Sequence, residues 1–283
     1  MMSLMSKLLT STLIATIALS ANVEKPNTIP SNEQLLQYIK KDIVKNPQVN
    51  VKGIEVIETK TDKALPGWNI LLTNMDIEYQ GKDVKVPETI FVKDGLATGH
   101  LVNLKDGHDY REDIKPTVPD SMYNDAHLLY GNKDAAHKVL LFSDPMCPFC
   151  REVVPDILKA AKEHPDKIAL YYYHLPLLRI HPVSGILTRV MHQAQAEGKK
   201  DVVDKMYSLK VDPRNTDMTK VLAKVKEHTG YSTTADKLDG KAEKDAIKND
   251  ADAAARLMVG GTPTVYIDGE WDKKRDGYKK LVK

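Results

Sequence analysis

The sequence predicts two consecutive units, a small α+β unit followed by an α/β unit that carries a helical insertion. Three patterns predict this order: one amphipathic helix followed by four β-type runs, a β-α-β arrangement in the second half, and a long helical stretch before a closing β-hairpin. A length of 283 residues suits about two domains of ordinary size.

The first unit spans residues 22–115 and opens with a helix that Ser31 caps and that continues to about residue 44. Its apolar face is formed by Leu35, Leu36, Ile39 and Ile43. Four β-type runs follow, at residues 49–59, 68–79, 84–93 and 96–104. Turn signals such as Lys93-Asp94-Gly95 separate the runs, so we expect an antiparallel meander. No cysteine or glycine-rich phosphate loop occurs in this unit, which therefore looks non-catalytic.

The second unit spans residues 135–283, after a segment at 116–134 in which we expect a linker helix over residues 122–130. Strands are predicted at 138–143, 167–174 and 264–267, and a helix with Pro155 inside it at 147–164. The helical insertion covers about residues 184–258. Asp268-Gly269 is typical of a hairpin turn leading towards Trp271.

Residues 1–21 have the layout of a secretory signal peptide. Lys7 precedes an apolar run at 8–19, and Ser20 and Ala21 supply small residues for cleavage. The run is shorter than the roughly 20 residues that cross a bilayer, which argues against the alternative of an uncleaved membrane anchor. We therefore expect a soluble, exported protein. The net charge of +2, with basic and acidic residues interspersed, gives no case for nucleic acid as a partner.

Cys147 and Cys150 are the only cysteines of the chain, and their spacing indicates redox chemistry. A zinc site would need further ligands nearby, and a structural disulfide over so short a loop would stabilise little. Two unrelated buried cysteines are the remaining alternative. Because the pair opens a helix directly after a buried strand, unpaired backbone N–H groups favour a thiolate at Cys147. Pro148 suits the first helical turn, and Cys150 should be the more buried, resolving thiol.

The helix dipole alone explains a modest effect on the pKa of Cys147. It contributes about 0.3 to 1 kcal/mol, and up to about 2 kcal/mol when partly buried, and about 1.36 kcal/mol corresponds to one pKa unit. A larger decrease needs direct hydrogen bonds, for which the backbone N–H groups of Phe149 and Cys150 are candidates.

The segment Phe142-Ser-Asp-Pro-Met-Cys-Pro-Phe-Cys150 resembles the active-site segment of the periplasmic DsbC/DsbG proteins, and Gly261-Thr262-Pro263 resembles the loop that faces the redox pair in that family. The resemblance implies a thioredoxin-like catalytic domain with a helical insertion. It also implies that the N-terminal unit is a cystatin-like dimerisation domain that builds a V-shaped homodimer. The expected location is the periplasm.

The resemblance also assigns roles to individual residues. Cys147 would attack a substrate disulfide and Cys150 would resolve the mixed disulfide. Pro263, if cis, would present its backbone to the substrate, and Thr262 precedes it as in isomerase-type members. Pro148 and Phe149 complete the expected substrate-binding set, with no metal ligand. The redox-active disulfide itself would serve in place of a cofactor. Asp144 is expected to cap the turn before Cys147, with a hydrogen bond near the cysteine loop as the alternative.

We expect a disulfide isomerase or reductase acting on exported, cysteine-containing proteins. A disulfide-donating oxidase and a reductase of sulfenylated cysteines use the same residues and stay open as alternatives. A chaperone in which redox chemistry is secondary is a further alternative from a different class. A membrane thiol-redox partner would recharge the cysteine pair.

Overall fold

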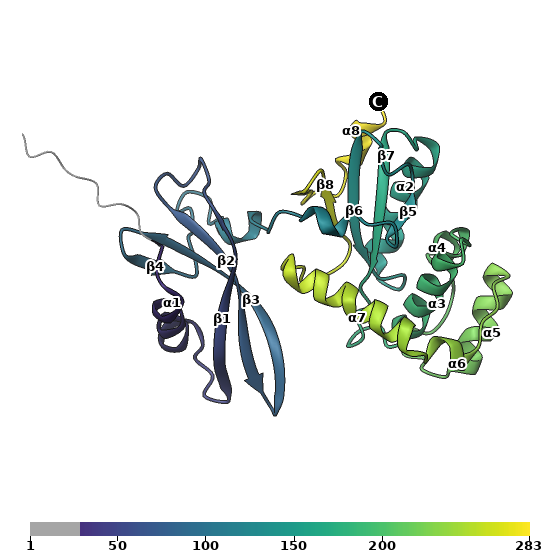
Figure 1. Cartoon of the computed structure of the whole chain (residues 1–283), viewed down its shortest axis with the longest axis horizontal. Coiled ribbons are helices and arrows are strands. Elements are labelled where there is room, and N and C mark those ends of the chain that lie inside the picture. Colours follow the sequence, from purple (N-terminus) through teal and green to yellow (C-terminus); the bar gives the residue numbers. More distant parts are fainter. Residues whose placement is uncertain (1–28) are drawn as a thin grey trace, which may run out of the picture.

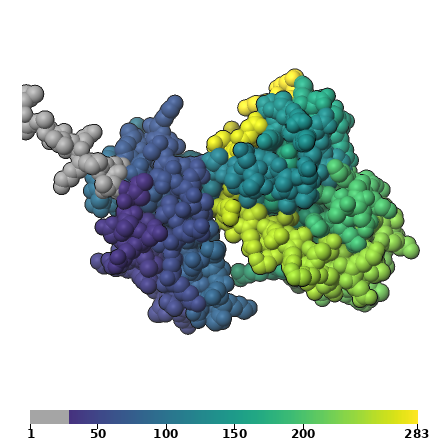
Figure 2. All heavy atoms as spheres, viewed as in Figure 1, coloured from purple at the N-terminus to yellow at the C-terminus, as the bar shows by residue number. Residues whose placement is uncertain are grey.

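The computed structural model describes residues 29–283, so the predicted signal peptide lies outside the described residues. Figures 1 and 2 show two lobes, an N-terminal one and a larger C-terminal one, joined by an extended segment. Among the described residues, no helix has the length and apolarity that spanning a membrane requires.

The N-terminal lobe is one helical segment packed on a four-stranded antiparallel sheet. The helix α1 (Asn32–Tyr38) continues as a π-helical turn, Ile39–Ile43, and Ser31 caps it in a capping box with Gln34. The strands pair in the order β1-β2-β3-β4, as the meander prediction expected. Their bounds are β1 (Val49–Lys60), β2 (Asn69–Tyr79), β3 (Lys82–Lys93) and β4 (Leu96–Thr98). The last strand is shorter than the predicted run at 96–104, and the chain bends at Gly99, where an added Cβ would lie 2.8 Å from the Ile43 side chain.

The C-terminal lobe is built on a five-stranded sheet with the order β5-β7-β6-β8-β9. Strands β6 and β7 are parallel, and the other neighbours are antiparallel. The bounds are β5 (Leu128–Tyr130), β6 (His137–Ser143), β7 (Ile168–His174), β8 (Thr264–Ile267) and β9 (Glu270–Trp271). Asp268 and Gly269 both have positive φ at the predicted hairpin turn.

Helices cover both faces of this sheet. One face packs against residues of α2, α3, α4 and α5, and the other against α7 and the turn that precedes β5. Tyr172 points into the first core, whereas Tyr171 and Tyr173 point into the second, as the strand period requires. The helices are α2 (Pro148–Glu163), α3 (Ser184–Ala196), α4 (Asp201–Met206), α5 (Met218–Thr229), α6 (Ala235–Leu238), α7 (Lys241–Arg256) and α8 (Tyr278–Leu281).

The prediction of a linker helix within residues 116–134 is wrong. This segment contains a single 3₁₀ turn, Asp120–Met122, and then the edge strand β5. Leu129 is fully buried against the helical core, which fixes the segment on the sheet. Gly131, just after β5, has a positive φ, and its backbone lies directly against that of Ile168, the first residue of β7. The C-terminal sheet therefore begins before residue 135.

The two lobes share a small apolar contact. Met258, just after α7, and Ile114 lie in one cluster with Ile70 and Phe91 of the N-terminal sheet. In Figure 1 the C-terminal end of α7 points towards the N-terminal lobe. Glu58 of β1 accepts hydrogen bonds from the backbone N–H and the hydroxyl of Thr117 at 2.8 and 2.9 Å. These contacts place the segment before β5 against both lobes.

Candidate active site

The two cysteines lie at the junction of β6 and α2. The chain leaves the buried strand at Ser143, turns through residues 144–146, and enters α2 with Cys147 as its N-cap and Pro148 in the first turn. Cys147 is 4% exposed, Cys150 is fully buried, and both are free thiols. Phe149 between them is 62% exposed. The helix start therefore presents one sulfur at the rim of the site and holds the other inside.

The surroundings of Cys147 favour its thiolate. A hydrogen bond from the Cys150 thiol is the largest cause, and it outweighs the opposing effect of burial. Thr262 and the backbone N–H groups of Cys150 and Phe149 add to it, so that the pKa of Cys147 falls to about 5. The two N–H groups named from the sequence thus do contribute, but the neighbouring thiol contributes more.

Cys150 has the opposite environment. Burial raises its pKa well above the ordinary value for a thiol, and the negative charge on Cys147 adds to the effect through their shared hydrogen bond. The Ser143 hydroxyl lies beside the Cys150 sulfur and favours its thiolate, as does the backbone N–H of Asp144. Ser143 Oγ lies 2.7 Å from the buried Tyr207 hydroxyl, which in turn contacts that of Tyr172. These hydroxyl groups come from distant segments, and no local motif in the sequence links them.

Thr262 and Pro263 face the cysteine pair from the start of β8. The Thr262–Pro263 peptide bond is cis, and the Cys147 sulfur lies 3.3 Å from the Thr262 carbonyl oxygen, to which it can donate only when it is protonated. The Thr262 hydroxyl is buried and makes no hydrogen bond in the geometry of the described residues. It nevertheless acts on both sulfurs, lowering the pKa of each.

Asp144 ties the cysteine loop to the helical insertion. Its fully buried carboxylate accepts from the Met146 N–H at 2.7 Å, which is the predicted turn cap. It also accepts from the backbone N–H of Leu177, the ring of His181 and the Ser184 hydroxyl, at 2.8, 3.1 and 2.6 Å. The sequence analysis weighed the cap and a hydrogen bond near the cysteine loop as alternatives. Asp144 does both, and the extra partners lie more than thirty residues downstream, out of reach of a local pattern.

A pocket of about 530 Å³ opens beside the redox pair, lined by Phe149, Thr262 and Pro263 together with residues of the segment before β5 and of the C-terminal hairpin. A wider cavity of about 1000 Å³ lies between β1, β3 and α7, away from both sulfurs.

Among residues 29–283, no three histidine, cysteine or acidic side chains are grouped so that they could hold a metal ion. The structure thus brings together all six residues named from the sequence: Cys147, Cys150, Thr262, Pro263, Pro148 and Phe149.

Comparison with known proteins matches residues 123–283 to the family model described as Thioredoxin. A "Probable disulfide bond formation protein D" of Bacillus anthracis is 25% identical over 162 residues, which cover 54% of this chain and 75% of that protein. The namesake from Bacillus cereus is 26% identical over the same shares of the two chains.

Among solved structures, oxidised BdbD from Bacillus subtilis is similar, with a TM-score of 0.47 and 16% identity over 60% of this chain and 98% of that chain. The catalytic domain of Proteus mirabilis ScsC matches with a TM-score of 0.43 and 22% identity, over 58% and 91% of the two chains. The relatives do not single out DsbC or DsbG. Because the matched family model covers more than half of the sequence, this chain belongs to the thioredoxin family.

Proposed function

We propose that this chain is an exported thiol–disulfide oxidoreductase that donates the Cys147–Cys150 disulfide to cysteine-containing client proteins. The observation that carries the proposal is the contrast between the two sulfurs: the pKa of Cys147 is lowered to about 5, whereas burial raises that of Cys150. At neutral pH the reduced centre therefore holds a stable thiolate at Cys147. Stabilising the reduced form makes the corresponding disulfide a stronger oxidant.

The donation takes two exchange steps. A client thiolate attacks the Cys147 sulfur, the Cys147–Cys150 bond breaks, and Cys150 leaves as a thiolate that takes up a proton because its pKa is high. A second client thiolate then attacks the client sulfur of the mixed disulfide, and Cys147 leaves as a stable thiolate. Two electrons pass from the client dithiol to the cysteine pair. A membrane-bound disulfide or quinone-linked partner would remove them again.

Three buried groups help the first step. The Ser143 hydroxyl, the Asp144 N–H and the Thr262 hydroxyl each favour negative charge on Cys150. Cys150 is the leaving group when the disulfide is attacked, so these contacts act where charge develops. Pro263, next to the nucleophile, offers its backbone to the client, with Pro148 and Phe149 at the exposed rim.

Isomerase activity is the second candidate, and the N-terminal lobe favours it. That lobe lies outside the family match and forms a separate sheet. A cystatin-like dimerisation role for it would place two catalytic sites around one client, as the expected V-shaped homodimer requires. Reduced Cys147 would then attack a wrong client disulfide, release one client thiolate, and leave when the correct client thiolate displaces it. With a sulfenylated client, the Cys147 thiolate would displace hydroxide, which takes up a proton to give water. Cys150 would then attack the mixed disulfide, releasing the client thiol and forming the Cys147–Cys150 disulfide.

The first experiment uses the mature protein to compare oxidation of a reduced substrate with rearrangement of a substrate that has wrong disulfides. The disulfide form is mixed with reduced ribonuclease, and the dithiol form with scrambled ribonuclease, each beside Cys147→Ser. We expect rapid, Cys147-dependent oxidation of the reduced substrate and slow recovery of the scrambled one. Strong recovery of scrambled ribonuclease by the dithiol form, without oxidation by the disulfide form, overturns donation in favour of isomerisation. Suppression of aggregation that survives Cys147→Ser indicates a chaperone.

Location and partners follow from this proposal. The predicted signal peptide at residues 1–21 and a need for clients that form disulfides both suit the periplasm. One structural neighbour is named a periplasmic thioredoxin-like protein from Salmonella enterica. We further propose a homodimer, a membrane redox partner, no nucleic acid, and no cofactor besides the Cys147–Cys150 pair.

A further inference from the structure

The pocket beside the cysteine pair carries an excess of positive charge. Its cationic side chains come from two separate segments, Lys115 before β5 and Lys273 and Arg275 after β9. Glu112 is its one acidic lining residue. The pocket therefore reaches from the substrate-facing loop, which also contacts Cys147, to three basic side chains.

Lys115 is partly buried without a carboxylate to balance it. Its ammonium group donates to the Met258 carbonyl oxygen at 2.7 Å and lies 5.6 Å from the centre of the Trp271 ring. Burial lowers its pKa, and it has no ion-pair partner among residues 29–283. An ammonium group that has lost part of its hydration gains more from an added carboxylate than one in bulk water does.

The other two basic residues of the pocket, Arg275 and Lys273, differ in whether they already have an ion-pair partner. Arg275 makes no ion pair within the described part of the chain, and its backbone N–H donates to the Asp272 carbonyl oxygen at 3.0 Å. Lys273 donates to Asp113 at 2.8 Å, and that pair is about half exposed on both sides. Lys115 and Arg275 are therefore the two charges that a ligand can satisfy.

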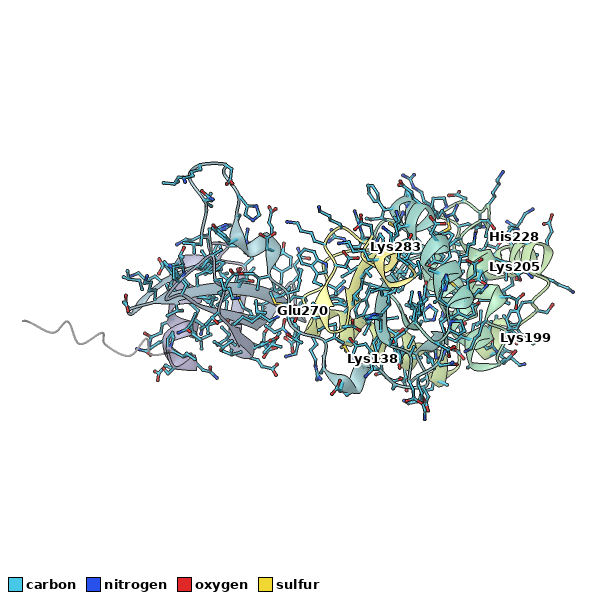
Figure 3. All side chains as sticks on the ribbon, turned by 90° about the horizontal axis from the view of Figure 1, so that it is seen from above. Lys138, Lys199, Lys205, His228, Glu270 and Lys283 are labelled. Carbon is cyan, nitrogen blue, oxygen red and sulfur yellow. The ribbon has the colours of Figure 1, made fainter. Side chains whose placement is uncertain are left out.

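The pocket has room for a polypeptide segment. Cβ atoms added at Gly260 or Gly261 would meet no heavy atom within 4 Å, so this wall is open along the backbone that leads to Thr262. Phe149 and Trp271 supply apolar surface to the lining. In Figure 3, Glu270 marks the side of the C-terminal lobe that faces the N-terminal lobe, and Trp271 follows it in the chain. A volume of about 530 Å³ suits a few side chains of a bound segment.

We propose that this pocket selects client segments that carry Asp or Glu within a few residues of the reacting cysteine, with Lys115 and Arg275 binding the client carboxylates. The inference rests on the proposed thiol–disulfide exchange and names the class of client that the same site prefers. The client cysteine bonded to Cys147 lies beside Thr262, since the Cys147 sulfur is 3.3 Å from the Thr262 carbonyl oxygen. Neighbouring client residues then extend along the glycine wall towards the basic side chains.

The test uses the full-length disulfide form and two dithiol peptides that differ only in charge. One peptide has Glu at the two positions following its first cysteine, and the other has Lys there. The rate constant for peptide oxidation is measured with the wild type, Lys115→Gln, Arg275→Gln and the double variant. Lys159→Gln, at an exposed position on α2 outside the pocket, is the matched control.

We expect the wild type to prefer the acidic peptide, and the double variant to lower the acidic-to-basic rate ratio by about fivefold to tenfold, with no change for Lys159→Gln. Acidic neighbours also raise the pKa of a peptide thiol. That effect belongs to the peptides and cancels when the ratio for a variant is divided by the ratio for the wild type. The preference should shrink in 1 M salt, where exposed charges are screened.

The experiment distinguishes failure of the proposed function from failure of the proposed charge selection. If neither peptide nor dithiothreitol is oxidised, the proposed function is wrong. If both peptides are oxidised and the double variant leaves their rate ratio unchanged, the exchange chemistry stands and the pocket has no role in charge selection. Should Lys115→Gln unfold, Arg275→Gln alone decides the outcome, because Arg275 has no side-chain hydrogen bond to another described residue.

Discussion

The opposite environments of Cys147 and Cys150 can be tested by the reactivity of one sulfur. Alkylation of Cys147 by iodoacetamide in the dithiol form should follow a titration with its midpoint near pH 5, since the hydrogen bond from Cys150 is the largest cause of the lowered pKa. In Cys150→Ala that bond is lost, so the midpoint should move upwards towards the ordinary range for a thiol. Mass spectrometry of the alkylated protein measures both profiles. An unchanged midpoint would mean that the backbone N–H groups and Thr262 are sufficient.

Asp144 shows how one buried side chain fixes the geometry of the site. Each of its oxygen atoms accepts two hydrogen bonds. In Asp144→Asn a single oxygen remains, and the new NH₂ group faces donors, so we expect a loss of about 2 to 4 kcal/mol in the free energy of unfolding. Urea denaturation of the dithiol form measures it. Asp156→Asn, exposed on α2, should stay within about 0.5 kcal/mol.

At the scale of elements, Gly131 allows the chain that leaves β5 to pass directly against the start of β7. An alanine Cβ there would overlap the backbone carbonyl group of Ile168, and φ is already positive. We expect Gly131→Ala to lower the free energy of unfolding by at least about 3 kcal/mol. Gly198 has a similar φ but open space around it, so Gly198→Ala should cost only about 1 kcal/mol. If urea denaturation showed the same loss of unfolding free energy for Gly131→Ala and Gly198→Ala, the steric argument would be contradicted.

Elements with strong local signals could be predicted from the sequence, and those fixed by long-range contacts could not. The capped helix at Ser31, the meander and the breaks of the helical insertion near Pro213, Gly230 and Gly240 all carry turn or capping residues. Strand β5 has only three residues, and its partner β7 lies about forty residues further on. A short apolar run of this kind fits a helix equally well until its partner is known.

Within the site, too, the residues with local signals could be predicted and those placed by long-range contacts could not. Cys147, Cys150 and Pro263 lie in recognisable motifs, and the N–H groups at the helix start follow from the position of Cys147. Ser143, Tyr207 and the full set of Asp144 partners meet only because the helical insertion folds back over the end of β6. Their residue types are common ones, and their roles depend on the positions that the fold gives them.

At the scale of the whole molecule, the redox state should change stability with pH. The pKa of Cys147 is depressed in the folded dithiol form, so the stabilisation it provides is complete above the unfolded pKa of roughly 8.5 and is lost as the pH falls through about 5. The disulfide form lacks this titration. The melting temperature of the dithiol form minus that of the disulfide form should therefore rise from pH 5 to pH 8. A difference independent of pH contradicts the stabilised thiolate.

The proposed role of the N-terminal lobe in dimerisation can be tested on the whole chain. If this lobe dimerises the protein, the mature chain should sediment as a dimer, and a variant lacking residues 22–115 as a monomer that still reduces insulin but isomerises scrambled ribonuclease poorly. The deletion exposes Met258, which packs against Ile70 and Phe91, so Met258→Gln in the shortened chain keeps it soluble. A shortened chain that remains dimeric would place the interface on the thioredoxin unit. A monomeric full-length chain would remove the paired sites on which the isomerase alternative depends.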